Sequence, residues 1–264
     1  MQFIIDNTKC TGCGLCISDC LRQVIELQNG IAVMANNNCF KCGHCLAICP
    51  AHAVKAENCG DEILEINGKQ AFLDEQDLLT HLKARRSVRQ YRNAPVEKEK
   101  IEKIIEAGRL TPTASNAQNV RFIVIQEEIG PVEDAVIAQY VPSSGMKPGE
   151  TPPPHLVPLP PAYDLSRLKR GFLFQGAPLV ILNISPSEIN GCLAAMSMEL
   201  MAEALGLGTV YVGLFARPAN HNQKLLESLG VGKDEKICSC LAIGYPRVKY
   251  QRTAPKKAAK VDWR

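Results

Sequence analysis

The sequence lacks the long apolar runs and the one-sided charge that mark several large classes of protein. None of its stretches approaches the roughly 18 consecutive apolar residues that a membrane-spanning helix needs, so we expect no membrane association. The opening residues, MQFIIDNTKC, hold no basic region followed by a long apolar stretch, so we expect no secretory signal and a cytoplasmic location. A formal charge of +3 over 264 residues gives little support for a nucleic-acid partner, and we expect none.

The two common glycine motifs for nucleotides are also missing. No G-x-G-x-x-G follows a predicted strand, and no G-x4-G-K-[ST] occurs, which argues against a Rossmann dinucleotide site and a P-loop. The length is too great for a small cysteine-rich module alone and suits one small domain followed by one of ordinary size.

Cysteine is what the sequence has in unusual amount, with twelve residues, eight of which form two copies of one pattern. The spacing C-x2-C-x2-C-x3-C occurs first at Cys10, Cys13, Cys16 and Cys20, and again at Cys39, Cys42, Cys45 and Cys49. Three cysteines at two-residue gaps wrap a loop around one face of an iron–sulfur cubane, and the fourth suits a different cluster. Four-cysteine sets also bind zinc, so two zinc sites are the alternative.

This duplicated pattern resembles the bacterial two-cluster ferredoxins. The resemblance implies two [4Fe–4S] clusters in a small domain at residues 1–60, with short strands between the loops. It also implies the ligand sets: one cluster is held by Cys10, Cys13, Cys16 and Cys49, and the other by Cys39, Cys42, Cys45 and Cys20. Pro50 follows Cys49 as in that family, whereas Leu21 stands where a proline would be usual.

After a linker at 61–77, residues 78–264 predict an α+β domain. Helices are expected at 77–86, 96–110, 133–140, 188–205 and 220–229, and strands at 120–126, 178–184, 209–215 and 237–243, from their apolar periodicity. A proline-rich insertion at 141–161 interrupts this pattern and is either a functional arm or an exposed loop. Cys192, Cys238 and Cys240 are expected to be packed small hydrophobes.

Two polar segments of this domain could hold an anionic cofactor. RRSVRQY places Arg85, Arg86 and Arg89 around Ser87, and clustered guanidinium groups suit the paired acceptors of a phosphate. About 25 residues later, TPTASNAQ (111–118) offers short side chains for hydrogen bonds to the edge of a heterocycle.

In this order and spacing, these segments together with QGAPLVILNI, EALGLGT, VYVG and IGYPRVKYQR resemble the nitroreductase family of flavoproteins. The resemblance covers about 78–252 and implies a mostly antiparallel central sheet and an FMN site across a homodimer interface. The residues that it assigns to FMN are Arg85, Arg86, Ser87 and Arg89, then Thr113, Ser115 and Asn116 from the partner subunit, Gln118, the backbone of Val212 and Gly213, and Lys249 or Arg252 at the phosphate.

The combination predicts an FMN-dependent oxidoreductase that passes electrons from two [4Fe–4S] clusters to FMN and on to a small organic acceptor. A nitroaromatic, a quinone or an activated alkene would serve as that acceptor, and the donor would be an external ferredoxin-type protein or NAD(P)H. No protein side chain is assigned to the chemistry, because the flavin supplies it. The alternatives are an electron-transfer or redox-sensing protein that acts on a protein partner, the reverse direction of electron flow, and a flavin-free binding module.

Overall fold

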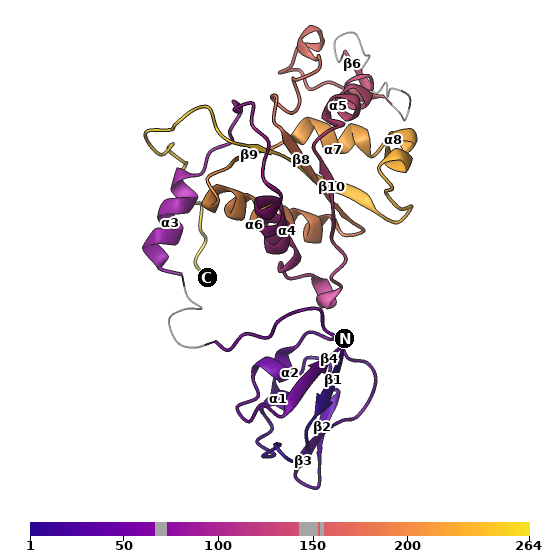
Figure 1. Cartoon of the computed structure of the whole chain (residues 1–264), viewed down its shortest axis with the longest axis vertical. Coiled ribbons are helices and arrows are strands. Elements are labelled where there is room, and N and C mark those ends of the chain that lie inside the picture. Colours follow the sequence, from indigo (N-terminus) through magenta and orange to yellow (C-terminus); the bar gives the residue numbers. More distant parts are fainter. Residues whose placement is uncertain (67–72, 143–152, 154–155) are drawn as a thin grey trace. The chain divides into compact units, whose positions relative to one another are not determined.

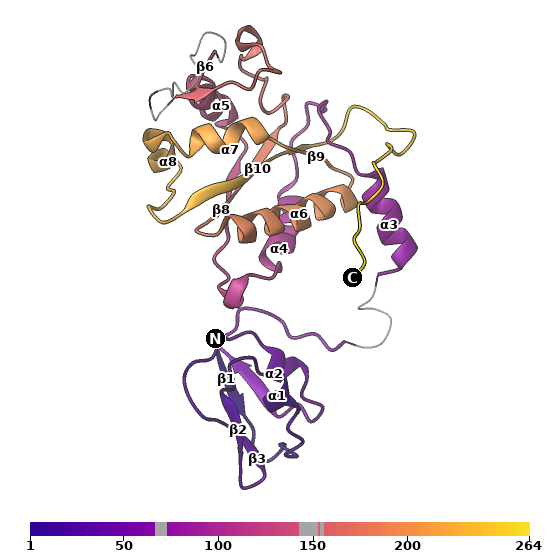
Figure 2. The same cartoon turned by 180° about the vertical axis from the view of Figure 1, so that it is seen from behind.

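The computed structural model describes residues 1–66, 73–142, 153 and 156–264, which form two compact units (Figures 1 and 2). The first unit comprises Met1–Phe72 and Thr113–Ala117, and the second comprises Leu73–Pro112 and Gln118–Arg264. Much of the proline-rich insertion and part of the expected linker lie outside the described residues.

The first unit is a small two-fold repeat built around its cysteine loops. Strands β1 (Gln2–Ile5) and β4 (Val54–Glu57) pair antiparallel, as do β2 (Ile25–Gln28) and β3 (Ile31–Met34). Each cysteine loop leads into a one-turn helix, α1 (Leu15–Ser18) or α2 (His44–Ala47). Gly14 and Gly43 precede these helices with φ of 76° and 79°, a left-handed conformation that glycine adopts without strain. A compact core of Cys16, Val24, Ile25 and Ala32 supports the loops.

The second unit is built on a four-stranded antiparallel sheet in the order β5-β8-β10-β9. This confirms the predicted α+β class and the antiparallel central sheet. The strands are β5 (Arg121–Ile125), β8 (Leu179–Ser185), β9 (Gly208–Tyr211) and β10 (Lys236–Gly244). A separate parallel pair joins β6 (Tyr140–Val141) and β7 (Val157–Pro158).

Helices cover both faces of this sheet (Figures 1 and 2). On one face, α4 (Lys98–Arg109) and α6 (Glu188–Ala204) pack Ile104 and Met198 against Leu179 and Ile181 of β8. On the other face, α5 (Ile129–Ile137), α7 (Gly213–Ala219) and α8 (Gln223–Ser228) pack against the intervening residues of β8. Every residue of β8 is buried, because helices cover both faces of the sheet, and all but Asn183 and Ser185 are apolar.

Most predicted elements lie within a few residues of their expected positions, with one error of type. Residues 209–215 were expected to form one strand, but β9 ends at Tyr211 and α7 begins at Gly213. Helix α5 begins at Ile129 rather than 133. Pro131 does not prevent this earlier start, because it lies in the first turn, where an amide hydrogen has no partner within the helix. Helix α3 (Glu75–Ala84) begins after Asp74, whose side chain accepts from the amides of Gln76 and Asp77.

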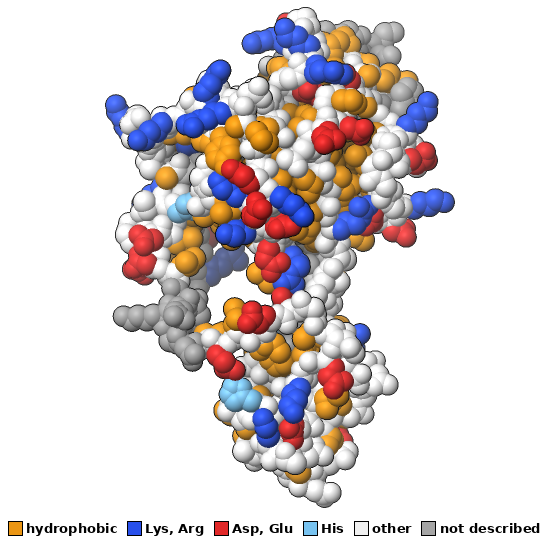
Figure 3. Space-filling model, viewed as in Figure 1, with side chains coloured by type: hydrophobic (Ala, Val, Ile, Leu, Met, Phe, Trp, Pro, Cys, Tyr) orange, Lys and Arg blue, Asp and Glu red, His pale blue; other side chains and the backbone are white. Residues whose placement is uncertain are grey.

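The described residues include no helix that is long and apolar enough to cross a membrane. On the face seen in Figure 3, acidic and basic side chains are interspersed rather than gathered by sign.

Candidate functional site

Two cavities in the first unit have linings that divide the eight patterned cysteines into two sets of four. One is lined by Cys10, Cys13, Cys16 and Cys49, and the other by Cys20, Cys39, Cys42 and Cys45. In each set, three cysteines come from one repeat and the fourth comes from the other. The structure thus brings together the same sets that the resemblance implies, with β1–β4 and β2–β3 holding the loops.

The electrostatics of these cavities favour a cationic occupant. Burial, and after it the approach of Cys39 and Cys42, raise the pKa of the Cys45 thiol to about 11. Burial likewise raises the pKa of Cys16, with Cys49, Cys10 and Cys13 adding to the effect. Converging thiolates of this kind are stable only when positive charge lies among them, as iron supplies.

Backbone amides point at several of these sulfurs. The amides of Ala32, Lys41 and Ala53 lie 3.4, 3.3 and 3.3 Å from Sγ of Cys10, Cys39 and Cys49 respectively. Burial alone would raise the pKa of Cys49, but amide hydrogen bonds outweigh it and hold that pKa below its ordinary value. Such N–H···S bonds are the contacts by which a protein adjusts the potential of a cluster. Among the described residues, no group of three or more His, Cys, Asp or Glu side chains could hold a single metal ion.

In the second unit, the arginine-rich segment lies along the outer edge of the sheet. Ser87 forms a parallel bridge with Thr209 of β9, and the amide of Val88 donates to the Thr209 carbonyl at 2.8 Å. Gly208 makes this approach possible, because an added Cβ would lie 2.5 Å from a methyl carbon of Val88. The pairing holds the segment that carries Arg85 and Arg89 against the edge strand β9.

The C-terminal segment lies beside the arginine-rich segment. The amide of Arg247 donates to the Gln90 carbonyl at 2.9 Å, and the hydroxyl of Tyr250 lies 3.4 Å from the Ser87 carbonyl oxygen. Lys249 is the neighbour of Tyr250 in the chain and is exposed, as is Arg252. The structure therefore brings the segment of Lys249 beside Ser87, and it does not distinguish Lys249 from Arg252 as a phosphate ligand.

Val212 and Gly213 form the junction between β9 and α7. The amide of Val212 donates to the Cys240 carbonyl at 2.9 Å, and the helix begins at the next residue. Pro218 lacks the amide hydrogen that would bond to the Leu214 carbonyl, and the Tyr140 hydroxyl donates to that carbonyl instead, at 2.5 Å. The junction is therefore held firmly although a proline interrupts its helix.

A cavity of about 260 Å³ opens at this junction. Arg89, Val212 and Gly213, three of the residues assigned to FMN, line it together with Tyr163, Phe172 and Gln175. The last three come from the segment before β8 and were not predicted. The rings of Tyr163 and Phe172 meet edge to face, with centroids 6.4 Å apart.

A buried carboxylate holds this segment in place. Glu133 of α5 is 1% exposed. Its oxygens accept from the amides of Gly171 and Leu173 at 2.6 Å and from that of Phe174 at 3.3 Å. Glutamate at this position looked like an ordinary helical residue in the sequence, and no local pattern signals its contacts.

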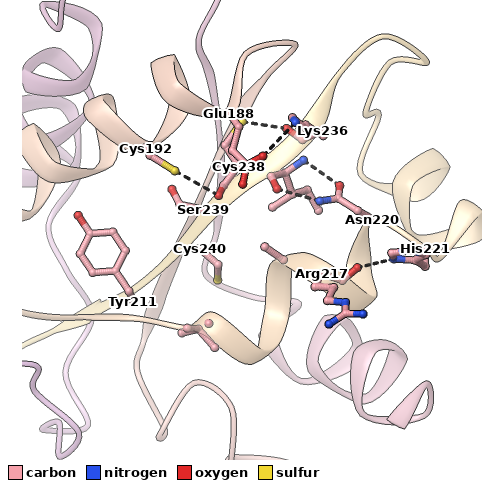
Figure 4. A pocket seen from close by; sticks show the side chains of 14 residues that line it. Glu188, Cys192, Tyr211, Arg217, Asn220, His221, Lys236, Cys238, Ser239 and Cys240 are labelled. Carbon is pink, nitrogen blue, oxygen red and sulfur yellow. Dashed lines mark hydrogen bonds and ion pairs between the residues drawn. The ribbon is translucent and has the colours of Figure 1, made fainter. Parts of the chain in front are cut away.

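A second cavity of about 530 Å³ lies on the other side of the junction, between α6, α7 and β10 (Figure 4). Tyr211, Val212 and Gly213 line both cavities. Cys192 lies on its wall and is exposed, which corrects the expectation that this thiol is packed, whereas Cys240 is buried as expected.

Beneath the arginine-rich segment lies a pair of carboxylates that sequence reasoning missed. Arg85 Nη1 donates to Glu199 Oε1 at 2.7 Å, and Glu203 lies one turn further along α6. The signal was present as two glutamates four residues apart in an otherwise apolar helix, since such a spacing places both on one face.

The remaining residues assigned to FMN lie in the other polar segment. Thr113, Ser115 and Asn116 pack with the first unit, and the side-chain amide of Asn116 donates to the carbonyls of Phe40 and Lys41. Ser115, Asn116 and Gln118 have φ of 54°, 52° and 47°, so the segment is a tight turn. A single chain does not test their assignment to a partner's flavin, which stays a prediction.

Comparison with known proteins identifies both parts of the chain. The model of the nitroreductase family matches residues 82–245, and that of the 4Fe-4S dicluster domain matches residues 2–50. An FMN reductase [NAD(P)H] of Bacillus subtilis is 29% identical over 175 residues, which are 64% of this chain and 66% of that protein. An Archaeoglobus fulgidus protein with the provisional name NADH dehydrogenase/NAD(P)H nitroreductase is 27% identical over 65% of this chain and 87% of its own length.

Solved structures show the same fold. A nitroreductase with bound FMN from Bacteroides fragilis has a TM-score of 0.56 at 20% identity, over 72% of this chain and 100% of that one. A nitroreductase with bound FMN from Desulfitobacterium hafniense has a TM-score of 0.54 at 20% identity, with the same coverage.

Proposed function

The chain belongs to the nitroreductase family and carries a 4Fe-4S dicluster domain, and from this premise we propose an FMN-dependent oxidoreductase that passes electrons from two [4Fe–4S] clusters to FMN and on to a small organic acceptor. A nitroaromatic, a quinone or an activated alkene is the proposed acceptor. The observation that carries the proposal is the presence, in one chain, of two four-cysteine cavities and a nitroreductase-type unit with an arginine-lined cavity.

The clusters would be held by the two cysteine sets that line the cavities. Cys10, Cys13, Cys16 and Cys49 would ligate one, and Cys39, Cys42, Cys45 and Cys20 the other. The amides that point at three of these sulfurs favour the reduced, more negative clusters. Cys13 and Cys42 are exposed, which gives each cavity one side open to an electron donor.

The flavin ring would occupy the cavity at the β9–α7 junction. Arg89 supplies positive charge there, and Val212 and Gly213 form part of the wall. Arg85, Ser87 and Lys249 or Arg252 would bind the phosphate and ribityl chain. FMN accepts electrons one at a time and delivers two to an organic molecule, and the residues around it bind, orient and exclude water.

A homodimer is the proposed assembly. Helix α6 carries Ile189, Leu193 and Met196 at helical spacing, with 72%, 46% and 37% of their surfaces exposed. Such a stripe of large apolar side chains is costly to leave in water and suits burial against a second copy. The partner would supply Thr113, Ser115 and Asn116 to the flavin.

An anaerobic reductive titration of the purified protein tests the proposal. Two clusters and one FMN require about four electrons per chain, one for each cluster and two for the flavin. We expect this stoichiometry, with bleaching of the flavin absorbance and a paramagnetic signal from reduced clusters. A plateau near two electrons with no flavin change would contradict the flavin assignment and the enzyme proposal with it.

A steady-state assay then tests the acceptor and the donor. We expect turnover of nitroaromatics or quinones with a chemically reduced ferredoxin or with NAD(P)H as donor. Protein stripped of FMN that still reduced these acceptors at the full rate would contradict the proposed route.

A further inference from the structure

Arg85, which we assign to the flavin phosphate, forms an ion pair with a buried carboxylate. Its guanidinium donates to Glu199 Oε1 at 2.7 Å, and the two side chains are 25% and 1% exposed. Thr209 donates to the same oxygen at 3.3 Å. Within the described part of the chain, no donor reaches the other carboxylate oxygen of Glu199, which is buried without a hydrogen bond. Arg85 is the cation paired with this buried carboxylate, so the ionised form of Glu199 depends strongly on it.

Glu203 brings a second carboxylate to the same place. Its side chain is 13% exposed, and it lies 3.5 Å from Nε2 of His81 on α3. The backbone amide of Arg86 also donates to it. Burial, and after it the negative charge of Glu199, raise the pKa of Glu203 to about 7 against the opposing effects of Arg85 and the Arg86 amide.

The charges that face Glu203 can be named from every element around it. Glu199 lies on its own helix, His81 on α3, and Arg85 in the segment after α3. Tyr211 of β9 faces Glu199. Burial is the larger cause that raises the pKa of the Tyr211 phenol, and the negative charge of Glu199 is the second. One arginine therefore stands between two carboxylates, with a histidine at the solvent side.

A flavin phosphate would add further negative charge to this group. A phosphate monoester carries between one and two negative charges near neutral pH. If it bound at Arg85 while Glu199 and Glu203 were both ionised, three anionic groups would meet at one guanidinium, and Lys249 or Arg252 would offset only part of their charge. Neutralising Glu203 is the smallest change that reduces this repulsion, because burial and Glu199 already favour its neutral form and it is more exposed to solvent than Glu199.

We propose that the binding of the flavin phosphate at Arg85 is coupled to the uptake of one proton by Glu203, so that the chain holds FMN more tightly as the pH falls toward neutral. The proposal rests on the proposed function, because it takes Arg85 as the phosphate ligand. Glu203 is then a positioning residue that acts on the flavin through Arg85. It links cofactor loading to the proton concentration of the surroundings.

The direction of the pH dependence follows from the protonation of Glu203 in the flavin-free and the flavin-bound chain. In the flavin-free chain Glu203 is largely protonated below about pH 7, so binding takes up few protons there and the affinity changes little. Above that pH the carboxylate must gain a proton when FMN binds. The dissociation constant then increases with pH, with a limiting slope of about tenfold per pH unit.

The experiment uses full-length protein whose clusters are intact and whose bound flavin has been dialysed away. This protein is titrated with FMN and, separately, with riboflavin. Flavin fluorescence gives dissociation constants between about pH 6.5 and 8.5, a range above the second ionisation of the phosphate itself. Calorimetry in two buffers of different ionisation heat gives the protons taken up. Glu203→Gln is the test variant. Glu102→Gln, on the exposed face of α4, is the matched control.

For FMN and wild-type protein we expect a dissociation constant that increases about three- to tenfold per unit above neutral pH, with close to one proton taken up. Riboflavin, which has no phosphate, should show neither effect. Glu203→Gln should bind FMN with an affinity that does not vary with pH, and Glu102→Gln should behave as wild type. FMN binding that is independent of pH in the wild type would overturn the inference and leave the proposed function intact, whereas no FMN binding at any pH would overturn both.

Discussion

Replacing Glu133 by glutamine should loosen the segment that closes the cavity at the β9–α7 junction. The carboxylate accepts from three backbone amides, those of Gly171 and Leu173 at 2.6 Å and that of Phe174 at 3.3 Å. Glutamine keeps one accepting oxygen but turns an N–H₂ group toward an amide that also donates. The substitution changes few atoms, so the loss reports the hydrogen bonds rather than a cavity.

The magnitude follows from these contacts. A hydrogen bond to a buried charged group contributes about 1.5–3 kcal/mol, and a neutral one about 1 kcal/mol. Oε2 accepts from Gly171 and Oε1 accepts from Leu173 and Phe174, so the glutamine that keeps most contacts loses the short bond from Gly171 and weakens the other two. We expect the segment to lose about 3 kcal/mol of local stability. This is roughly a hundredfold increase in the equilibrium constant for local opening.

Hydrogen exchange read by mass spectrometry measures this opening directly, without assuming that two units unfold in one step. Peptides that cover 170–175 should exchange roughly a hundred times faster in Glu133→Gln, whereas those from β8 should change little. Glu127→Gln, which replaces an exposed glutamate just before α5, is the control. Protection of 170–175 that stayed within about threefold of wild type would refute the assignment of Glu133 as the anchor.

Three further substitutions test other parts of the structure. Cys13→Ser should lower the iron and acid-labile sulfide of the purified protein by about half, because only one of the two cavities loses a ligand. Gly208→Ala should cost about 1–3 kcal/mol and weaken FMN binding, since its Cβ would displace Val88 and the arginine segment with it. Arg121 lowers the pKa of Glu235, and this pairing contributes to the stability of the wild type. The contribution is present above the ordinary carboxyl pKa and is lost as the pH falls through the lowered value. Glu235→Gln should remove it. Because the pair is partly exposed, its loss should be at most about 1 kcal/mol at neutral pH, measured by thermal unfolding across the acid range.

Matched controls separate these effects from general damage. Cys192→Ser should leave iron content unchanged, because Cys192 lies in the second unit. Gly60→Ala adds a methyl group where no atom lies within 4 Å and should leave FMN binding as it is. Glu102→Gln breaks an exposed pair with Lys98 and should not alter the acid limb of unfolding. Equal iron loss in Cys13→Ser and Cys192→Ser would contradict the assignment of the first cavity.

The sequence predicted those parts of the fold whose signal is local. The spacing of the eight cysteines is a strict repeat, so it identified the first unit without any knowledge of its packing. The apolar run of β8 and the periodicity of α4 and α6 are equally local, because the side chains that face the core recur at the period of the element. These elements lie within a few residues of their predicted positions.

The parts that failed depend on contacts between distant residues. VYVGLFA is an apolar run that either a strand or a buried helix could form, and the choice at Gly213 is made by packing against β10 and by the Tyr140 hydroxyl. The pairing of Arg85 with Glu199 joins residues 114 positions apart, and that of Glu133 with Leu173 joins residues 40 apart. No window of sequence contains both partners, so neither pair could be predicted.

The crossed linings of the two cysteine cavities bear on how the first unit arose. Each repeat supplies four cysteines, but Cys20 and Cys49 line the cavity of the other repeat. A chain with a single repeat could therefore complete a cavity only by exchanging its last cysteine with a second copy of itself. Gene duplication would turn such an exchange between two molecules into one within a single chain. After that step, neither half could be lost without leaving the other one ligand short.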